Sequence, residues 1–169
     1  MIIGNGNIAR VIDDRDDVIF FASGVSDSSC TDDDAFIREI ELLYGQDRNK
    51  HLVYFSGHNI YTKTTPYAKH KIGMEQTVKH LFNSYTIVRL GICDWNTNPK
   101  TIINHYKEVI KSGRPIVYNS DDMIRHIVTL NDFKYWLSLI RVGEREEMNI
   151  TGRMITVPEL IEEIKQGKL

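Results

Sequence analysis

Three apolar runs separated by helical segments constrain the fold of this chain more than any other feature. The runs cover residues 18–24, 51–55 and 85–91, and each has the length and composition of a buried strand. The segments between them, residues 31–44 and 66–83, open with acidic residues or a proline, which favour the first turn of a helix. Strands that alternate with helices build parallel sheets with right-handed crossovers, so the sequence predicts an α/β fold.

The rest of the chain continues this pattern at both ends. Residues 1–3 form a short apolar strand that leads into the G-x-G-x-x-A turn of Gly4, Gly6 and Ala9 and then a short helix. Such a turn lets a backbone approach a pyrophosphate, although the motif alone is weak. Further helices are predicted near residues 101–111, from 131 or 132 to 140, and after 156, and strands near 125–130 and 147–150.

The composition indicates one domain without a strongly charged surface. At 169 residues, folding buries roughly 70% of the surface of the unfolded chain, which allows a sizeable core. The net charge of −2 gives no electrostatic reason to expect nucleic acid or an anionic membrane as a partner. No run approaches the ~18 apolar residues of a membrane span, and the first residues do not have the pattern of a leader.

Neither the cysteines nor the acidic residues suggest a metal site. Cys30 and Cys93 are too few and too far apart for a metal knuckle or a disulfide framework, so we expect a reduced, cytoplasmic protein. Asp32, Asp33 and Asp34 are consecutive, and adjacent residues of a helix point in different directions. We therefore interpret them as a helix start and predict no metal.

Tyr67 and Lys71 are the strongest candidates for chemistry. They lie four residues apart in a predicted helix, which places both side chains on one face. A nearby ammonium favours the phenolate, so Lys71 can lower the pKa of Tyr67, and its three donors can also hold a sugar hydroxyl. An exposed helix face that carries Tyr and Lys by accident has the same spacing, and the spacing alone leaves that alternative open.

Several segments, in order along the chain, resemble the extended short-chain dehydrogenases/reductases, especially the nucleotide-sugar epimerases, dehydratases and reductases. The most specific match is residues 66–71, which include Tyr67 and Lys71, followed by Glu75. The other matching segments are residues 4–9, 20–24, 52–56 with 60–61, 88–91, 125–132, 148–150 and 155–160. The resemblance covers nearly the whole chain and implies a Rossmann-like parallel sheet with flanking helices.

The resemblance also implies roles for individual residues. Tyr67, Lys71 and Ser56 are expected to be catalytic, and a nucleotide sugar is expected to be bound by His58, Asn59 and Arg125. NAD or NADP is the expected cofactor, held by Gly4, Gly6, Ala9, Ala22, Ser23, Gly24 and Lys71. Family members commonly dimerise through the helix that bears the tyrosine. A homodimer is therefore expected here, with Ile72, Val78 and Leu81 available for that interface or, as the safer interpretation, for the core.

Two departures from the family pattern bear on function. The family places a strand, a helix and a strand between the first helix and Val18, where this chain has only a handful of residues. The second and third strands, which form the adenosine side of the cofactor cleft, are thus missing, and the sheet should end at its first strand. The usual catalytic Ser/Thr position falls on Gly57, so Ser56 can replace it only in an irregular turn. His58 and Asn59 occupy the positions of the acid/base pair of the dehydratases. Neither of them is a carboxylate, so dehydratase chemistry is disfavoured.

The expected organisation is a single shortened domain over residues 1–169. Residues 1–95 and 127–150 would form the sheet core, and residues 96–126 and 151–169 a small substrate-side region. Two functions stay open: an NAD(P)-dependent oxidoreductase or epimerase acting on a nucleotide sugar, and a catalytically reduced relative that binds a nucleotide or protein partner. A structural or assembly protein is a third, weaker alternative. The residue that usually separates NAD from NADP lies in the missing segment.

Overall fold

Five parallel strands form the main sheet, in the order β1-β2-β3-β4-β7. The computed structural model describes residues 1–117 and 124–169. The strands are Ile2–Ile3 (β1), Val18–Phe21 (β2), His51–Gly57 (β3), Tyr85–Leu90 (β4) and Arg145–Ile150 (β7). The Rossmann-like parallel sheet predicted from the sequence is confirmed.

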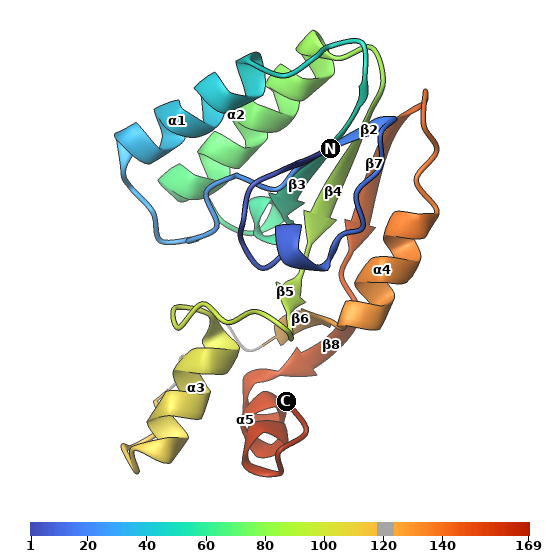
Figure 1. Ribbon diagram of the computed structural model, residues 1–169. Helices are drawn as coiled ribbons and strands as arrows, with labels where there is room; N and C mark the ends of the chain where they lie inside the picture. Colours follow the sequence, from blue (N-terminus) through green and yellow to red (C-terminus); the bar gives the residue numbers. More distant parts are fainter. Residues whose placement is uncertain (118–123) are drawn as a thin grey trace.

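Helices cover both faces of this sheet (Figure 1). Helices α1 (Asp33–Tyr44) and α2 (Pro66–Leu81) pack on one face, and α4 (Leu130–Ser138) packs on the other. Because successive side chains of a strand point to opposite faces, each central strand contributes to both cores. In β3, for example, Tyr54 packs in the core beneath α1 and α2, whereas Phe55 packs in the core beneath α4.

The sheet ends at β1 in the part of the chain that the structure describes. Ile2 and Ile3 pair with β2, and no other described strand pairs with β1. The connection to β2 contains only a 3-10 helix of three residues, η1 (Ala9–Val11). Among the described residues, the second and third strands of the usual Rossmann fold are therefore absent, as the sequence predicts.

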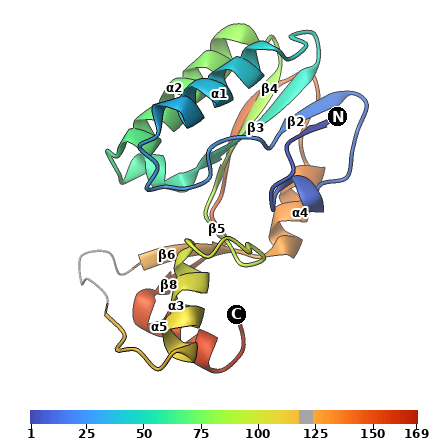
Figure 2. The same ribbon diagram turned by 60° about the vertical axis from the view of Figure 1, so that its left-hand side comes forward.

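A second, smaller sheet lies beyond the carboxyl ends of the main strands (Figures 1 and 2). It consists of β5 (Ile92–Cys93), β6 (Ile124–Val128) and β8 (Arg153–Thr156), and it packs against α3 (Ile102–Lys111) and α5 (Val157–Lys165). The sequence predicts β6 but assigns its last two residues to the main sheet. They belong to the second sheet because β6 pairs with β5 and β8. The sequence does not predict this pairing, since β5 and β8 are too short to show a strand periodicity of their own. The single-domain assignment stays a prediction.

The apolar residues of α2 differ in their exposure. Val78 is fully buried and Leu81 is partly buried in the core beneath the helix. Ile72 is 43% exposed, so its interpretation as a core residue is wrong. Ile72 is thus the one large apolar side chain that α2 exposes, and the homodimer stays a prediction.

Candidate active site

Tyr67 lies in the first turn of α2, beside the carboxyl end of β3. The helix begins here because the Thr65 hydroxyl accepts a hydrogen bond from the Ala68 amide (3.2 Å) and Pro66 occupies the first turn. Tyr67 is only 6% exposed, and a Cβ atom on Gly57 would lie 3.2 Å from its hydroxyl oxygen. The phenol thus faces the end of β3, where ligands bind in open α/β sheets.

Lys71 is buried one turn further along α2. Its ammonium lies 6.0 Å from the centre of the Tyr67 ring, so the predicted placement on one helix face is correct. It donates to Glu39 Oε1 (2.9 Å), to the Tyr54 hydroxyl (3.1 Å) and to the Phe55 carbonyl oxygen (3.5 Å). An ammonium has three donors, so all of them are already used within the protein. A contact with a cofactor ribose requires that one of these bonds, of which the bond to Phe55 is the longest, be exchanged.

Glu39 of α1 is the partner that the sequence does not reveal. Its side chain is fully buried and accepts from four donors, namely Tyr54, Lys71, His70 and the Val25 amide. Burial alone would raise the pKa of this carboxyl, but the charge of Lys71 and the hydrogen bonds outweigh it and lower the pKa to about 2. Glu39 is therefore a carboxylate that neutralises Lys71. In the sequence, Glu39 stands four residues before Leu43 on the apolar side of the helix, and this position is the signal that could have indicated its burial.

The pKa of Tyr67 is raised, which contradicts the prediction that Lys71 lowers it. Burial of the phenol is the largest cause, followed by the negative charges of Glu39 and Asp27. Lys71 does not offset these effects because its charge is already paired with Glu39. Tyr67 is thus a protonated phenol at neutral pH.

Gly57, and not Ser56, borders the Tyr67 hydroxyl. Ser56 is 5% exposed, and its hydroxyl has no hydrogen-bond partner among the described residues. Adjacent strand residues face opposite sides, and β3 keeps its ladder with β4 through both positions, so the turn is not irregular here. The catalytic role of Ser56 stays a prediction.

His58 and Asn59 follow in a short 3-10 helix, η2 (His58–Tyr61). The His58 ring packs against His126 of β6, with ring centres 4.6 Å apart. Burial, and secondly the neighbouring His126, lower the pKa of His58. The sequence does not predict that His126 lies beside His58, because 68 residues separate the two and only the fold brings them together.

The glycine-rich turn is built around Gly4 and Gly6. Gly4 has φ +124°, and a Cβ atom there would lie 2.4 Å from the Ala22 carbonyl oxygen, so only glycine fits. Gly6 borders open space, since a Cβ atom there would meet nothing within 4 Å. Ala9 is buried in η1, whose single turn provides little of the dipole that a longer helix offers to a phosphate.

Ser23 and Gly24 lie in the loop that connects β2 to α1. Arg38 donates to the Ser23 carbonyl oxygen (3.0 Å), which ties the end of β2 to α1. A Cβ atom on Gly24 would lie 2.6 Å from Lys71 Nζ and 2.7 Å from Glu39 Oε1. Gly24 thus provides the space that the Glu39–Lys71 pair requires.

Arg89 of β4 and Arg125, the predicted substrate-binding arginine, have different surroundings. Arg89 is buried and bonds the carboxylates of Glu75 and Glu147, so it has a structural role. Arg125 lies in β6 of the second sheet, where its guanidinium donates to the Ile124 carbonyl oxygen (3.0 Å). Its contact with a substrate diphosphate stays a prediction.

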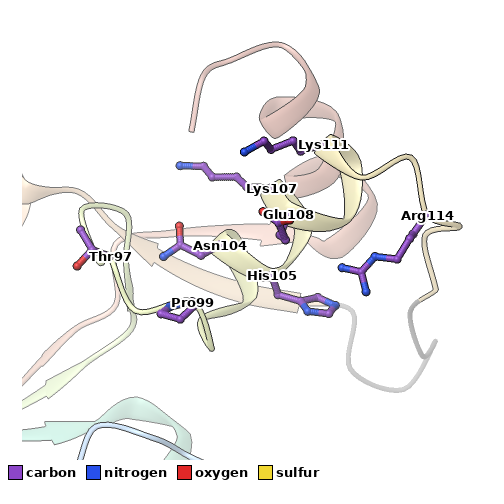
Figure 3. Close-up of a pocket in the computed structure, with 8 residues that line it drawn as sticks. All are labelled: Thr97, Pro99, Asn104, His105, Lys107, Glu108, Lys111 and Arg114. Carbon is purple, nitrogen blue, oxygen red and sulfur yellow. The ribbon is translucent and has the colours of Figure 1, made fainter.

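A hollow of about 470 Å³ is lined by α3 and by residues on either side of that helix (Figure 3). Lys107 and Lys111 extend to one side of the helix, whereas His105 and Arg114 extend to the other. The hollow contains none of the predicted site residues.

Within residues 1–117 and 124–169, no group of three or more His, Cys, Asp or Glu side chains is placed to hold a metal ion. The helices described there are all too short or too polar to cross a membrane.

The similarity of this chain to known proteins lies in its structure. No protein-family model matches the sequence, and no curated protein matches it. A UDP-glucuronic acid 4-epimerase from Bacillus cereus, solved with UDP-glucuronic acid and NAD, has a TM-score of 0.67 at 13% identity over 89% of this chain. A UDP-glucose 4-epimerase from Thermotoga maritima, solved with UDP-glucose, has a TM-score of 0.67 at 17% identity over 89% of this chain. A dTDP-glucose 4,6-dehydratase from Streptomyces venezuelae, solved with NAD, has a TM-score of 0.67 at 17% identity over 90%.

The match covers only part of these larger proteins. It spans 59%, 60% and 57% of the three chains, respectively. At such low identities the similarity shows the fold alone. The chain has a shortened Rossmann-like fold of the kind found in epimerases and dehydratases of nucleotide sugars.

Proposed function

We propose that the protein is a nucleotide-sugar oxidoreductase or epimerase of the short-chain dehydrogenase/reductase kind, with Tyr67 as its acid/base residue. The observation that carries this proposal is the Tyr67 hydroxyl beside Gly57, with the Lys71 ammonium on the same side of α2. Structures of similar fold were solved with NAD and with nucleotide sugars, which supports this class of ligand.

The residues present fit the nicotinamide half of NAD or NADP. Gly6 leaves its backbone open to a phosphate, and Ser23, Tyr67 and Lys71 lie around the carboxyl ends of β2 and β3, where they would hold the nicotinamide ribose. Nothing in the described chain extends the sheet past β1, where the adenosine half would lie. When bound, a nicotinamide ring supplies hydride transfer.

Tyr67 would act as an acid at neutral pH. Because burial raises its pKa, the phenol keeps its proton until a substrate carbonyl oxygen accepts it. The phenolate left behind is close to Lys71 and regains a proton from solvent. The proposed direction is therefore reduction of a sugar carbonyl to an alcohol, in which the carbonyl carbon would take hydride from a reduced nicotinamide and the carbonyl oxygen would take the Tyr67 proton.

A binding protein without turnover is the second candidate. Glu39 already pairs with Lys71, and Gly57 provides no hydroxyl beside Tyr67. Both features weaken catalysis while leaving the nucleotide-binding end of the sheet intact.

Thermal unfolding with NAD⁺, NADH, NADP⁺ and NADPH up to millimolar tests the proposal. Turnover is assayed with UDP-glucose or UDP-glucuronic acid and NAD⁺ or NADP⁺, which runs the proposed reduction in reverse. A ligand at 100 times its dissociation constant stabilises the fold by ~2.7 kcal/mol, which raises Tm by roughly several degrees. We expect a shift that Tyr67→Phe retains, whereas that variant loses turnover. A shift without turnover in the native chain supports the binding protein, and no shift with any of the four contradicts the dehydrogenase proposal.

We also propose a homodimer and a cytoplasmic location. The exposed Ile72 side chain of α2 supports the first, and the small number of cysteines supports the second. Sedimentation equilibrium of the native chain beside Ile72→Glu tests the dimer, because a buried glutamate at the interface should shift the equilibrium to monomer.

A further inference from the structure

Asn59 fills the space that Gly57 leaves open beside Tyr67. An ideal Cβ atom on Gly57 would lie 2.6 Å from Asn59 Oδ1 and 3.2 Å from the Tyr67 hydroxyl oxygen. The first distance is too short for an ordinary contact, so the carboxamide occupies the place where a side chain at residue 57 would begin. The amide and the phenol therefore border the same small volume.

The oxygen of this amide has no partner within the described chain. Asn59 Oδ1 is buried and receives no hydrogen bond from the described residues. A buried polar atom without a partner is costly and uncommon in folded proteins. A polar ligand atom between Asn59 and Tyr67 would satisfy it.

The backbone around Asn59 is held firmly. Its carbonyl oxygen accepts from the amides of Thr62 (3.1 Å) and Lys63 (3.0 Å). Two residues later, the Tyr61 hydroxyl accepts from the Arg89 guanidinium (2.9 Å). Because Arg89 is itself paired with buried Glu75, this end of η2 is fixed to the sheet, and the amide is positioned before a ligand arrives.

We propose that Asn59, instead of a serine or threonine, holds the sugar hydroxyl of the reduced product against Tyr67. This inference rests on the proposed function. With Oδ1 facing the site, Asn59 accepts a hydrogen bond and the Tyr67 hydroxyl donates one. An alcohol satisfies both, whereas a carbonyl oxygen can only accept. The pair therefore recognises a sugar hydroxyl, which is the product of the proposed reduction, and Ser56 is not required.

The position of the amide can be tested without any ligand. Gly57→Ala should lower Tm in the native chain, because the new methyl group displaces the amide, and it should lower Tm less in Asn59→Ala. Gly73→Ala is the matched control, since Gly73 lies on α2 with no atom within 4 Å of a new Cβ. An equal effect of Gly57→Ala in both backgrounds would place the amide elsewhere and overturn the proposal.

The ligand role is tested by calorimetric binding of UDP-glucose to the native chain in the presence of NAD⁺. Asn59→Ala should weaken binding about 3- to 10-fold, the effect of one lost hydrogen bond. Adding Gly57→Ser to that variant should restore binding, because it supplies a hydroxyl at the same place. Unchanged binding in Asn59→Ala, or no rescue by Gly57→Ser, contradicts the role. If the native chain does not bind UDP-glucose, the proposed function and the ligand role fail together, while the unfolding experiment still decides where the amide lies.

Discussion

Glu39 decides what Lys71 can contribute. The sequence correctly places Tyr67 and Lys71 on one helix face, because a four-residue spacing determines that locally. It does not show that the ammonium turns toward α1, where Glu39, 32 residues earlier, takes its charge. Burial of the phenol, and secondly the negative charges of Glu39 and Asp27, raise the pKa of Tyr67, so the expected effect is reversed.

Breaking this buried pair should be costly. Glu39→Gln leaves the Lys71 ammonium buried without its counter-charge, which is expected to lower the free energy of unfolding by roughly 3 to 5 kcal/mol. Glu39→Gln combined with Lys71→Met should cost less than Glu39→Gln alone, since no charge stays unpaired. Urea unfolding measures the native chain, Glu39→Gln, Lys71→Met and the double variant, with Glu41→Gln on the exposed side of α1 as the control. A double variant as unstable as the sum of its single variants would show that the pair is not coupled.

The same carboxylate should make stability depend on pH in acid. The pKa of Glu39 is lowered from 4.5 to about 2 in the folded protein. Its contribution is therefore fully present above pH 4.5 and is lost as pH falls toward 2, on the order of 3 kcal/mol in total. Urea unfolding between pH 2 and 6 should show this slope in the native chain and a smaller one in Glu39→Gln. Parallel curves for the two proteins would argue against an ionised Glu39.

At the scale of elements, the glycine-rich turn differs from its sequence motif. The motif predicts a turn followed by a helix that faces a pyrophosphate. The polar segment of residues 13–17 and the start of β2 leave room for only the single turn of η1. Gly4 serves the close approach to Ala22, whereas Gly6 is the position left open to a ligand.

These two glycines should therefore respond differently to substitution. Gly4→Ala combines a strained φ with a backbone clash, so we expect it to lower the free energy of unfolding by roughly 2 to 4 kcal/mol. Gly6→Ala should change stability by less than about 0.5 kcal/mol, as is usual for open surface positions. Thermal unfolding compares the two, and titration with NADH then shows whether Gly6→Ala alone weakens cofactor binding. Equal destabilisation by both substitutions would contradict the assigned roles.

At the scale of the whole molecule, the shortened sheet would limit how the proposed dinucleotide binds. In the proposed function the described chain provides residues around the nicotinamide end, but β1 is the edge strand of its sheet. The adenosine half would therefore make few contacts with the same chain.

This geometry predicts that the adenosine half of NADH adds little to its binding affinity. Reduced nicotinamide mononucleotide should bind with a dissociation constant within about threefold of that for NADH, because affinity follows well-packed contacts and not ligand size. Isothermal titration calorimetry measures both, with ADP-ribose as a control that should bind far more weakly. NADH binding more than 100-fold tighter than the mononucleotide would mean that another copy or another segment completes the cleft.

The sequence by itself determined the strands and helices of the main sheet, the short connection before β2, and the shared face of Tyr67 and Lys71. Each of these follows from local periodicity, from segment length or from the order of segments. Only the tertiary structure decided that Glu39 neutralises Lys71, that β6 joins a second sheet, and that Asn59 fills the space beside Gly57. Such contacts depend on how separate elements pack, and differences of an ångström, which no local pattern encodes, determine whether a group is paired or left open.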